Sequence, residues 1–436
     1  MGSNNILFLG VFCVTLAAAS HEQRLSEQSE GPEAPVTLDN GVISLTFGLV
    51  RGDFALTNLS RRSLGTDDGG AVESDNLVGN STTGAPMWSI GVVDANRSVQ
   101  ITSGSANCSA RSARLVGAKG NGPQKVVLTW QQVQMLGATA TVTLTVRLDR
   151  GADSSYWQLE AVNNDPTATE GLWNASVFFN GLRAGGDDDA VFRPQGFGTV
   201  SSVNDGTWCS APDYPSNDAT MQFSALGGSG PTGVFTGALD PHAVPKVLAY
   251  GLRGPLYADF RCCRALVQGS DDPNGTVLSG CVFGDRDRAA TTTSADFGYI
   301  SAVRPAGVSW STFRLPYEVV LGVIPLGVAS TVESRRQMLW WEAAMRYRRW
   351  AMDAAPWTKG SHMHVRSDVP QWWRDTHLMA NSHWQCAAPF NHSEATAEVV
   401  VPRALRLREL VGNFTLHWYV ENGHCWVPWL TAFHFC

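Results

Sequence analysis

Glycine is distributed unevenly along this 436-residue chain, and this division limits the folds that the chain can adopt. Of its 43 glycines, only Gly360, Gly412 and Gly423 follow Gly327, whereas 10 of the 16 tryptophans and 8 of the 10 histidines lie after residue 339. At about 150 residues per domain, the length allows two or three domains. We therefore expect the architecture to change near residue 330, from a segment with many turns to one with few.

The glycine-rich part has the pattern of β-structure. Residues 36–326 repeat short β-branched or alternating runs that are separated by Gly, Asp, Asn and Pro. The run 139–148 alternates threonine with valine or leucine, so one face of such a strand is apolar and the other is polar. Asn40 and Gly41 lie between two runs and predict a hairpin, because Asn-Gly accepts the positive φ of a type I′ turn. The fold class that this pattern predicts is mainly β, with a large antiparallel β-sandwich over 36–326.

A helix is expected to link this sandwich to the rest of the chain, within residues 330–357. Ser330 and Glu333 have the spacing of a capping box, and Pro356 would end the helix. The expected apolar face, which should pack across the sandwich, repeats at helical spacing and consists of Trp340, Ala344, Tyr347 and Ala351. For Trp340, Trp341 and Trp350 we favour packing, in the core or between domains, over ligand binding.

Residues 369–436 have the pattern of an α/β fold. The segments 377–384 and 414–420 read as buried strands, and Pro402 and Gly412 bracket a short helix between them. Strand, helix, strand is the repeating unit of a (β/α)₈ barrel, so the sequence predicts the incomplete start of such a barrel.

Several features predict a secreted or lumenal glycoprotein without a stable membrane anchor. Residues 6–19 form an uncharged apolar run followed by small residues, typical of a signal peptide within 1–20 and too short to span a bilayer. Without Cys13, eight cysteines remain, an even number compatible with disulfides. Eight sequons of the Asn-x-Ser/Thr type occur, at Asn58, Asn80, Asn96, Asn107, Asn174, Asn274, Asn391 and Asn413.

Other classes of function have little support. With 32 basic and 39 acidic residues and no basic run, the chain is not expected to bind nucleic acid. We predict neither a metal site nor a cofactor, because the histidine spacing is irregular and CxxC, P-loop and G-x-S-x-G motifs are absent from the sequence. The acidic segments 185–189 and 285–287 could offer oxygen ligands to Ca²⁺, but they lack EF-hand spacing, and solvated turns are the simpler interpretation.

Four segments carry a resemblance to a known family. TLDNGVISLTFGLVRGDFALTNL, WWEAAMRYRRWAMDAAPW, VPQWW and LHWYV resemble a glycoside-hydrolase-like family, many of whose members are classed as a domain of unknown function. The resemblance implies a galactose-mutarotase-like β-sandwich joined to a catalytic TIM barrel, as in alpha-galactosidases. It also implies the hydrolysis of glycosidic bonds by two carboxylates on later barrel strands.

The sequence departs from this family after Val420. A complete barrel takes about 200–250 residues, and only 67 follow Val369. We therefore expect a truncated barrel of at most two strand–helix units, which lacks the catalytic carboxylates. The chain would then be a carbohydrate-active protein related to glycoside hydrolases but inactive by itself. The alternative is a non-catalytic glycan-binding or structural secreted glycoprotein.

The candidate ligand is a carbohydrate, either an oligosaccharide or a polysaccharide. Residues at the carboxyl ends of barrel strands line the active site. Aromatic rings stack on the C–H faces of sugars, and His or Asn can bond to hydroxyl groups. The residues expected to contact sugar on this basis are Asn381, His383, Trp384, His417, Trp418 and Tyr419. The competing interpretation of these rings is core or inter-domain packing.

Overall fold

The computed structural model divides the chain into two compact units, Met1–Ala351 and Met352–Cys436. The residues that the structure describes are 34–62, 76–79, 86–94, 98–117, 123–165, 167–168, 170–186, 188–193, 198–203, 209–210, 213–215, 219–252, 295–302, 310–359, 366–367, 369–374, 378–383, 402, 405–406, 409–410, 416–421 and 430–435. The predicted signal peptide lies outside these residues.

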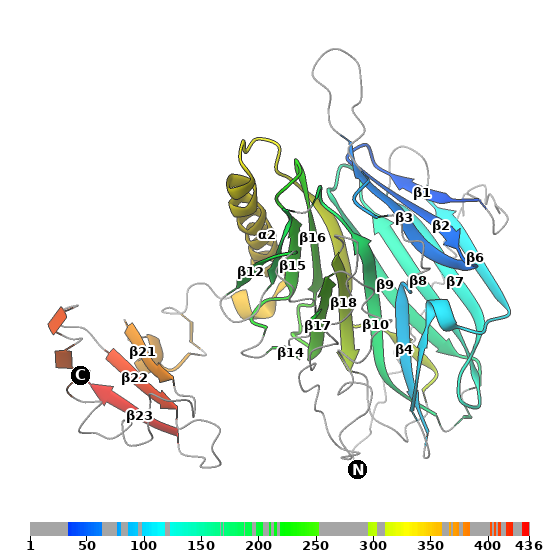
Figure 1. Ribbon diagram of the computed structural model, residues 1–436. Coiled ribbons are helices and arrows are strands. Elements are labelled where there is room, and N and C mark those ends of the chain that lie inside the picture. Colours follow the sequence, from blue (N-terminus) through cyan, green and yellow to red (C-terminus); the bar gives the residue numbers. More distant parts are fainter. Residues whose placement is uncertain are drawn as a thin grey trace, which may run out of the picture. The chain divides into compact units, whose positions relative to one another are not determined.

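The first unit contains three antiparallel sheets (Figure 1). The smallest has the order β1-β2-β3, with β1 at Val36–Asp39, β2 at Ile43–Val50 and β3 at Asp53–Arg61. Strand β1 lies against β6 (Ala110–Val116) and β7 (Gln124–Gln134), so this sheet covers part of a larger one.

The two larger sheets contain seven and ten strands. The seven-stranded sheet has the order β13-β17-β18-β10-β4-β5, and β14 also pairs with β17. Its strands are β4 (Trp88–Val93), β5 (Ser98–Thr102), β10 (Gly171–Leu182), β13 (Cys209–Ser210), β14 (Asp213–Tyr214), β17 (Lys246–Leu252) and β18 (Ala295–Ala302).

The ten-stranded sheet has the order β12-β11-β15-β16-β20-β9-β8-β7-β6, and β19 also pairs with β9. Its other strands are β8 (Thr139–Leu148), β9 (Ser154–Asn163), β11 (Ala190–Arg193), β12 (Thr199–Ser202), β15 (Phe223–Gly227), β16 (Thr232–Leu239), β19 (Thr312–Arg314) and β20 (Glu318–Pro325). A short 3-10 helix, η1 (Ser103–Ser105), follows β5. The mainly β fold with large antiparallel sheets is confirmed, and β8 has the predicted bounds and the predicted alternation of buried and half-buried residues.

The hydrophobic core gathers large aromatic side chains from all three sheets. Trp88, Trp130 and Trp157 are fully buried. The ring of Trp157 makes edge contacts with Phe47 at 5.6 Å and with Phe179 at 5.0 Å between centroids. One ring thus joins β2, β9 and β10, and such pairs stabilise by about 0.5–1.5 kcal/mol beyond the area that they bury.

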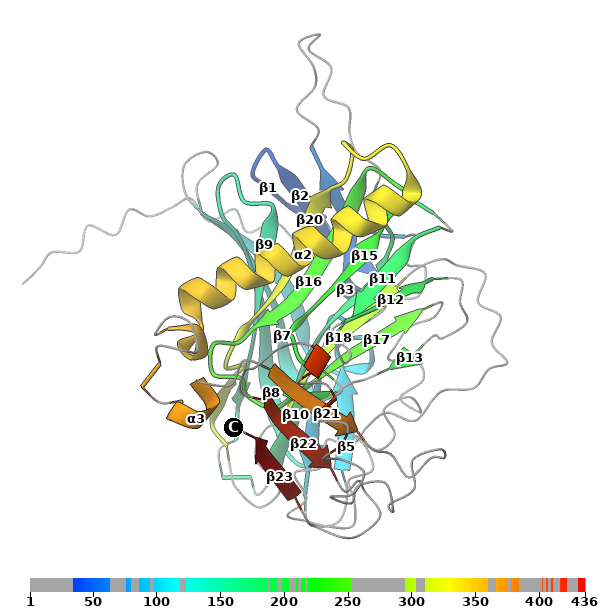
Figure 2. The same ribbon diagram turned by 90° about the vertical axis from the view of Figure 1, so that its left-hand side faces the viewer.

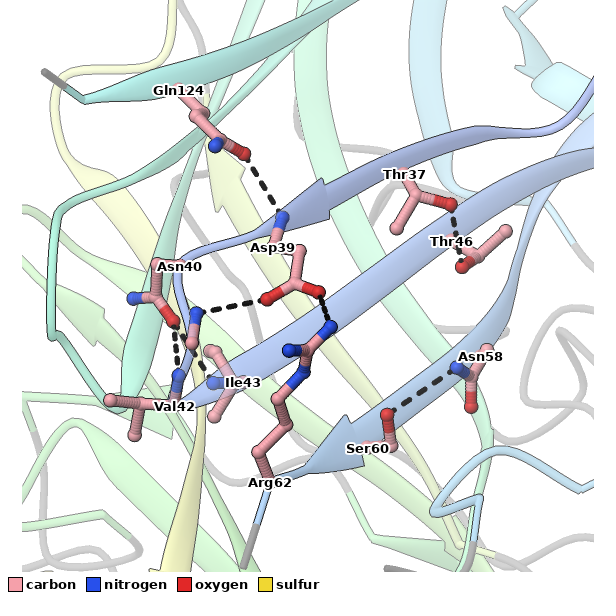
Figure 3. Close-up of polar contacts among 11 residues, drawn as sticks. Thr37, Asp39, Asn40, Val42, Ile43, Thr46, Asn58, Ser60, Arg62 and Gln124 are labelled. Carbon is pink, nitrogen blue, oxygen red and sulfur yellow. Dashed lines mark hydrogen bonds and ion pairs between the residues drawn. The ribbon is translucent and has the colours of Figure 1, made fainter. Parts of the chain in front are cut away.

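The turn predicted at Asn40 and Gly41 is present. Gly41 has a φ of 84°, and the Asp39 carboxylate accepts a hydrogen bond from its amide at 2.9 Å (Figure 3). Asn40 Oδ1 accepts bonds from the amides of Val42 and Ile43, both at 3.0 Å. Asn40 is not among the residues with positive φ, so the turn is not of type I′. The side-chain oxygen of Asn40 closes the turn instead, through these two hydrogen bonds.

The predicted linker helix is α2, Val332–Ala354, which crosses the ten-stranded sheet over β15, β16 and β20 (Figure 2). Its buried residues are Leu339, Ala343 and Ala351, and the first two pack in a cluster with residues of that sheet such as Phe223. Of the predicted face, Ala351 is buried and Ala344 and Tyr347 pack against this cluster, whereas Trp340 is exposed and Leu339 docks beside it instead. Trp340 and Trp341 are 38% and 53% exposed and do not lie in the sandwich core.

Polar contacts also hold the beginning of α2. The Thr331 hydroxyl accepts a hydrogen bond from the Ser334 amide at 3.1 Å, so the cap is at Thr331 and not at the predicted Ser330. Arg335 donates to the carbonyl oxygens of Gly228, Ala329 and Ser229 at 2.9, 3.2 and 3.0 Å.

The second unit contains a small mixed sheet of order β21-β22-β23. Strands β21 (Leu378–His383) and β22 (Leu416–Glu421) are parallel, and β23 (Leu430–Phe435) is antiparallel to β22. The unit also includes η3 (Pro356–Thr358), α3 (Gln371–Arg374) and helical residues within 402–410. Both predicted strands are present; β23 was not predicted, and its direction differs from that of a repeated strand–helix unit. Within the described residues, no helix has the length and apolar character needed to cross a membrane.

Candidate functional site

The register of the small sheet places most of the predicted sugar-contacting residues on one face. Alternate residues of a strand lie on the same face, and directly paired residues of neighbouring strands share a face. Asn381 pairs with Tyr419 and His383 pairs with Glu421. His417 is two residues before Tyr419 and shares the same face. The polar positions of this face are Asn381, His383, His417, Tyr419, Glu421 and His434, and the same face also carries the apolar Met379, Leu430 and Ala432. We call it the polar face.

The third strand adds His434 to this face, because the antiparallel pairing sets it directly opposite His417. The opposite face of the sheet is almost entirely apolar. Its positions are Leu378, Ala380, Ser382, Leu416, Trp418, Val420, Thr431, Phe433 and Phe435. A sheet with one apolar and one polar face buries the first and leaves the second for solvent or a ligand.

Four of the six predicted residues are thus brought together, namely Asn381, His383, His417 and Tyr419. Trp418 lies on the opposite face, because it is adjacent in sequence to two residues of the polar face. The predicted sugar contact of Trp418 therefore stays a prediction, separate from those of the four residues on the polar face. Trp384 lies outside the described residues.

The sequence prediction missed Glu421, which completes the polar face. We expected the second strand to end at Val420, but β22 continues to Glu421, whose register partner is His383. The alternation His417, Tyr419, Glu421 is visible in the sequence and could have identified this carboxylate. It lies at the carboxyl end of a parallel strand, where functional residues of α/β folds gather.

The residue types of the polar face are suited to hydroxyl-rich ligands. Amide, imidazole, phenol and carboxylate groups supply both donors and acceptors for hydrogen bonds. Retaining and inverting glycoside hydrolysis each use two carboxyl groups. Among the described positions of this face, Glu421 is the single carboxylate. The face as described can bind sugar hydroxyls but does not contain a catalytic pair.

The acidic segment 185–189 in the sandwich is a structural loop. Asp189 is 2% exposed, so the solvated-turn prediction is wrong for this residue. One carboxylate oxygen accepts bonds from the Ala184 and Gly186 amides at 3.1 and 3.4 Å. The other accepts bonds from the Ser229 amide at 3.0 Å and from the Ser229 hydroxyl at 2.5 Å. This carboxylate ties two loops together. The second acidic segment, 285–287, lies outside the described residues, as does Asp187.

A second polar cluster lies fully inside the sandwich. Lys246 and Asp240 are both completely buried, with 2.6 Å between Nζ and Oδ2. The ammonium also lies 4.8 and 4.7 Å from the ring centroids of Tyr214 and Tyr317. Burial lowers the pKa of Lys246 and raises the pKa of Tyr317. The cluster holds loops in the core, because Asp240 also accepts bonds from two backbone amides, at 2.6 and 2.8 Å.

Three of the eight predicted glycosylation sites lie among the described residues. Asn107 is exposed and Asn58 is half-buried, whereas Asn174 is 3% exposed. The other five, Asn80, Asn96, Asn274, Asn391 and Asn413, lie outside the described residues. Among the residues whose side chains the structure describes, no group of three or more His, Cys, Asp or Glu could hold a metal ion.

Comparisons with known proteins agree with the resemblance carried by the sequence. No family model matches the chain. A protein of Monosiga brevicollis named "Putative glycoside hydrolase 22789" is 26% identical over 298 residues, which are 67% of this chain and 21% of that protein. The chain therefore spans about a fifth of this curated relative's length. Its relatedness to glycoside-hydrolase-like proteins is confirmed.

The solved structures to which this chain is partly similar include two enzymes. An alpha-N-acetylgalactosaminidase from Bifidobacterium bifidum, bound to GalNAc, has a TM-score of 0.45 and 9% identity, with 88% of this chain and 51% of that chain covered. A GH36 alpha-galactosidase from Geobacillus stearothermophilus, in complex with raffinose, has a TM-score of 0.38 and 11% identity, with 80% and 45% covered.

Proposed function

We propose that this chain is a secreted carbohydrate-active protein and that the polar face of the β21-β22-β23 sheet is its sugar-binding surface. The observation that carries the proposal is the register, which aligns Asn381 with Tyr419 and His383 with Glu421 at one end of two parallel strands. Each of these residue types can bond to a hydroxyl group.

The sequence relationship supports carbohydrate as the ligand class. The relative from Monosiga brevicollis is named "Putative glycoside hydrolase 22789", and its alignment covers 67% of this chain at 26% identity. The separation of polar and apolar residues onto opposite faces supports a ligand-facing role for the polar one. Packing against other elements would be served by the face that carries Trp418 and the two phenylalanines.

For the 436-residue chain we propose sugar binding without hydrolysis. The described polar face offers Glu421 as a carboxylate, and a second carboxyl group at the separation that hydrolysis requires is not among its described positions. In this proposal Glu421 accepts hydrogen bonds from sugar hydroxyls, which are stronger than bonds between neutral groups.

The test is a comparison of matched variants of the full chain on a panel of immobilised oligosaccharides. Glu421→Gln and Tyr419→Phe remove a charge or a hydroxyl from the polar face. Glu421→Gln should weaken binding at least about tenfold, as expected when a charge-assisted bond worth about 1.5–3 kcal/mol is lost. Tyr419→Phe loses a neutral bond worth about 0.5–1.5 kcal/mol and should weaken binding about two- to tenfold. The matched control is Ser382→Ala, a polar truncation one residue from His383 on the opposite face, which should bind as the parent chain does.

Two results would contradict this proposal. Equal losses for Ser382→Ala and Glu421→Gln would show that the face is not the site. Turnover of aryl-glycosides by the parent chain, abolished in Glu421→Gln, would replace binding with hydrolysis as the activity.

The proposal of secretion rests on sequence features, namely the apolar run at 6–19 and the number of sequons. Expression of the chain with its own residues 1–20 in cultured eukaryotic cells should deliver it to the medium. Deletion of 1–20 should retain it inside the cell. Recovery of the parent chain in the cytosolic fraction alone would refute secretion.

A further inference from the structure

The three sequons among the described residues, at Asn58, Asn107 and Asn174, lie in different environments. The differences indicate which of the three asparagines can carry a glycan in the folded protein. We propose that Asn58 and Asn107 carry N-linked glycans in the folded protein and that Asn174 does not. This inference rests on the proposed entry into the secretory pathway. It goes beyond that proposal because it assigns the modification to individual side chains.

Asn58 lies on the outer face of the β1-β2-β3 sheet, among polar residues (Figure 3). Its register partner is Thr46, whose hydroxyl lies 3.0 Å from that of Thr37 on the next strand. The Asn58 side-chain nitrogen makes one long bond, 3.5 Å to the Ser60 hydroxyl. Replacing one amide hydrogen with a sugar therefore disturbs little. The row of hydroxyls from Thr46 and Thr37 offers hydrogen bonds to that sugar.

Asn107 lies in the connection between η1 and β6 and is exposed. The connection is fixed through its backbone: the carbonyl oxygen of Asn107 accepts a bond from the Gln134 amide at 2.9 Å. The Ser109 amide donates to the Gln131 carbonyl at 2.9 Å. An asparagine held in this way presents its side chain to solvent without taking part in the packing of the sandwich.

Asn174 has the opposite environment, although its sequon is equally good in sequence. It lies in β10, which pairs with β4 on one side and with β18 on the other. The side-chain oxygen accepts a bond from Gln100 at 3.1 Å. A methyl group added at the facing Gly91 would already lie 2.7 Å from that oxygen, so not even one carbon fits between them. A sugar on Asn174 would hold β10 out of its sheet.

N-glycosylation requires that the asparagine side-chain nitrogen reach the oligosaccharide donor. The oligosaccharide moves from a lipid-linked pyrophosphate donor to the asparagine side-chain nitrogen. The bond between the sugar anomeric carbon and the phosphate oxygen breaks, a carbon–nitrogen bond forms, and the amide loses one proton. Transfer precedes folding, so Asn174 could meet the donor as an extended chain. A chain modified at Asn174 could not complete the sandwich, and the folded product is therefore expected to lack that glycan.

The test separates this inference from the proposal of secretion by supplying a heterologous leader in place of residues 1–20. The full remaining chain is expressed in eukaryotic cells, and the folded, secreted fraction is treated with a glycosidase that converts glycosylated asparagine to aspartate. Peptide mapping should then show aspartate at positions 58 and 107 and unmodified Asn174. Asn58→Gln and Asn107→Gln should each remove the mass of one glycan, whereas Asn174→Gln, as matched control, should remove none.

Mapping of the parent chain keeps the inference falsifiable even if a variant does not fold. Aspartate at position 174 in the folded fraction would overturn it, and so would unmodified asparagine at position 58 or 107. The chain with its own residues 1–20 could fail to reach the medium while the chain with the heterologous leader shows aspartate at 58 and 107 and unmodified Asn174. That combination would refute secretion but support the assignment of acceptors.

Discussion

The two units of this chain contain sheets of different kinds. In the sandwich, residues from three sheets meet around Trp88, Trp130 and Trp157, all fully buried, so the apolar faces of the strands are covered within one unit. The small sheet has three strands and separates its residues by face, with Trp418, Phe433 and Phe435 on one side and the polar face on the other. Three strands with one apolar face are near the lower limit for independent stability. The comparison indicates that the sandwich supplies most of the stability and the small sheet the candidate chemistry.

The largest effect on stability is expected from removing one charge of the buried Lys246–Asp240 pair in the sandwich. Asp240→Ala leaves the buried Lys246 ammonium without its carboxylate, and we expect a loss of about 3–5 kcal/mol in the free energy of unfolding. Denaturant titration measures it. The double variant Asp240→Asn with Lys246→Met removes both charges and should recover part of that loss. An unchanged midpoint in Asp240→Ala would show that this cluster does not stabilise the sandwich.

A second test measures how much the packing of α2 on the sandwich contributes to the free energy of unfolding. Leu339 is 2% exposed in the cluster beneath the helix, and Leu339→Ala should lower the free energy of unfolding by about 2–5 kcal/mol through the cavity that it leaves. Trp341→Ala is the matched control on the same helix. Because that ring is 53% exposed, its removal should change stability by less than about 0.5 kcal/mol. The reverse order would contradict the register of α2 described here.

The loop tied by Asp189 should show an intermediate effect. Asp189→Asn exchanges one accepting oxygen for an amide group that faces backbone amides, so about 1–3 kcal/mol should be lost. Thermal unfolding and denaturant titration both report this change. If Asp189 were a calcium ligand instead, added Ca²⁺ would raise the unfolding midpoint of the parent chain, and we expect no such shift.

The smallest effect for a single residue concerns alkaline pH. Burial raises the pKa of Tyr299, Tyr317 and Tyr347 above the usual value of about 10. Above this pH the unfolded chain releases tyrosine protons that the folded chain retains, so stability present at neutral pH is lost as the pH rises. The lowered pKa of Lys246 has the opposite effect on stability, in a lower pH range. Below about pH 10.4 the unfolded lysine keeps a proton that the folded one releases more readily, so there the free energy of unfolding rises with pH.

The free energy of unfolding should therefore fall between pH 10 and 11, by about 1 kcal/mol for each such tyrosine. Denaturant titrations at pH 9, 10 and 11 measure the slope. Tyr317→Phe should reduce that slope, and an equal slope in this variant would exclude Tyr317 as a source.

Period-two patterns in the sequence predicted the strands well where one face is buried, as in β8. The helix was predicted, and so were three residues of its docking face, Ala344, Tyr347 and Ala351, but Trp340 was chosen where Leu339 docks. Apolar residues surround the helix at Leu339, Trp340 and Trp341, so spacing alone could not select the side that docks. In the small sheet, the sequence identified four residues of the polar face. It missed Glu421, because the end of a strand is set by pairing with neighbours and not by its own composition.

Other features could not be inferred from local sequence at all. The burial of Asp189 depends on Ser229, 40 residues away, and the burial of Asn174 depends on its position between two pairing partners. An acidic loop and a sequon look the same in the sequence whether they face solvent or the interior. Long-range pairing decides which of the two occurs.

The bonds of Arg335 have a consequence for how the chain can vary. Its guanidinium group holds α2 through three main-chain carbonyl oxygens and no side chain. This contact does not depend on the side chains at 228 and 229, but both residues are restricted for other reasons: Gly228 has a φ of 124°, and the Ser229 hydroxyl donates to Asp189. Arg335 itself has little freedom, because a lysine ammonium cannot reproduce the planar fork that meets three carbonyls at once. Both sides of the contact are thus restricted, the loop by its backbone course and by Asp189, and the helix by the guanidinium group of Arg335.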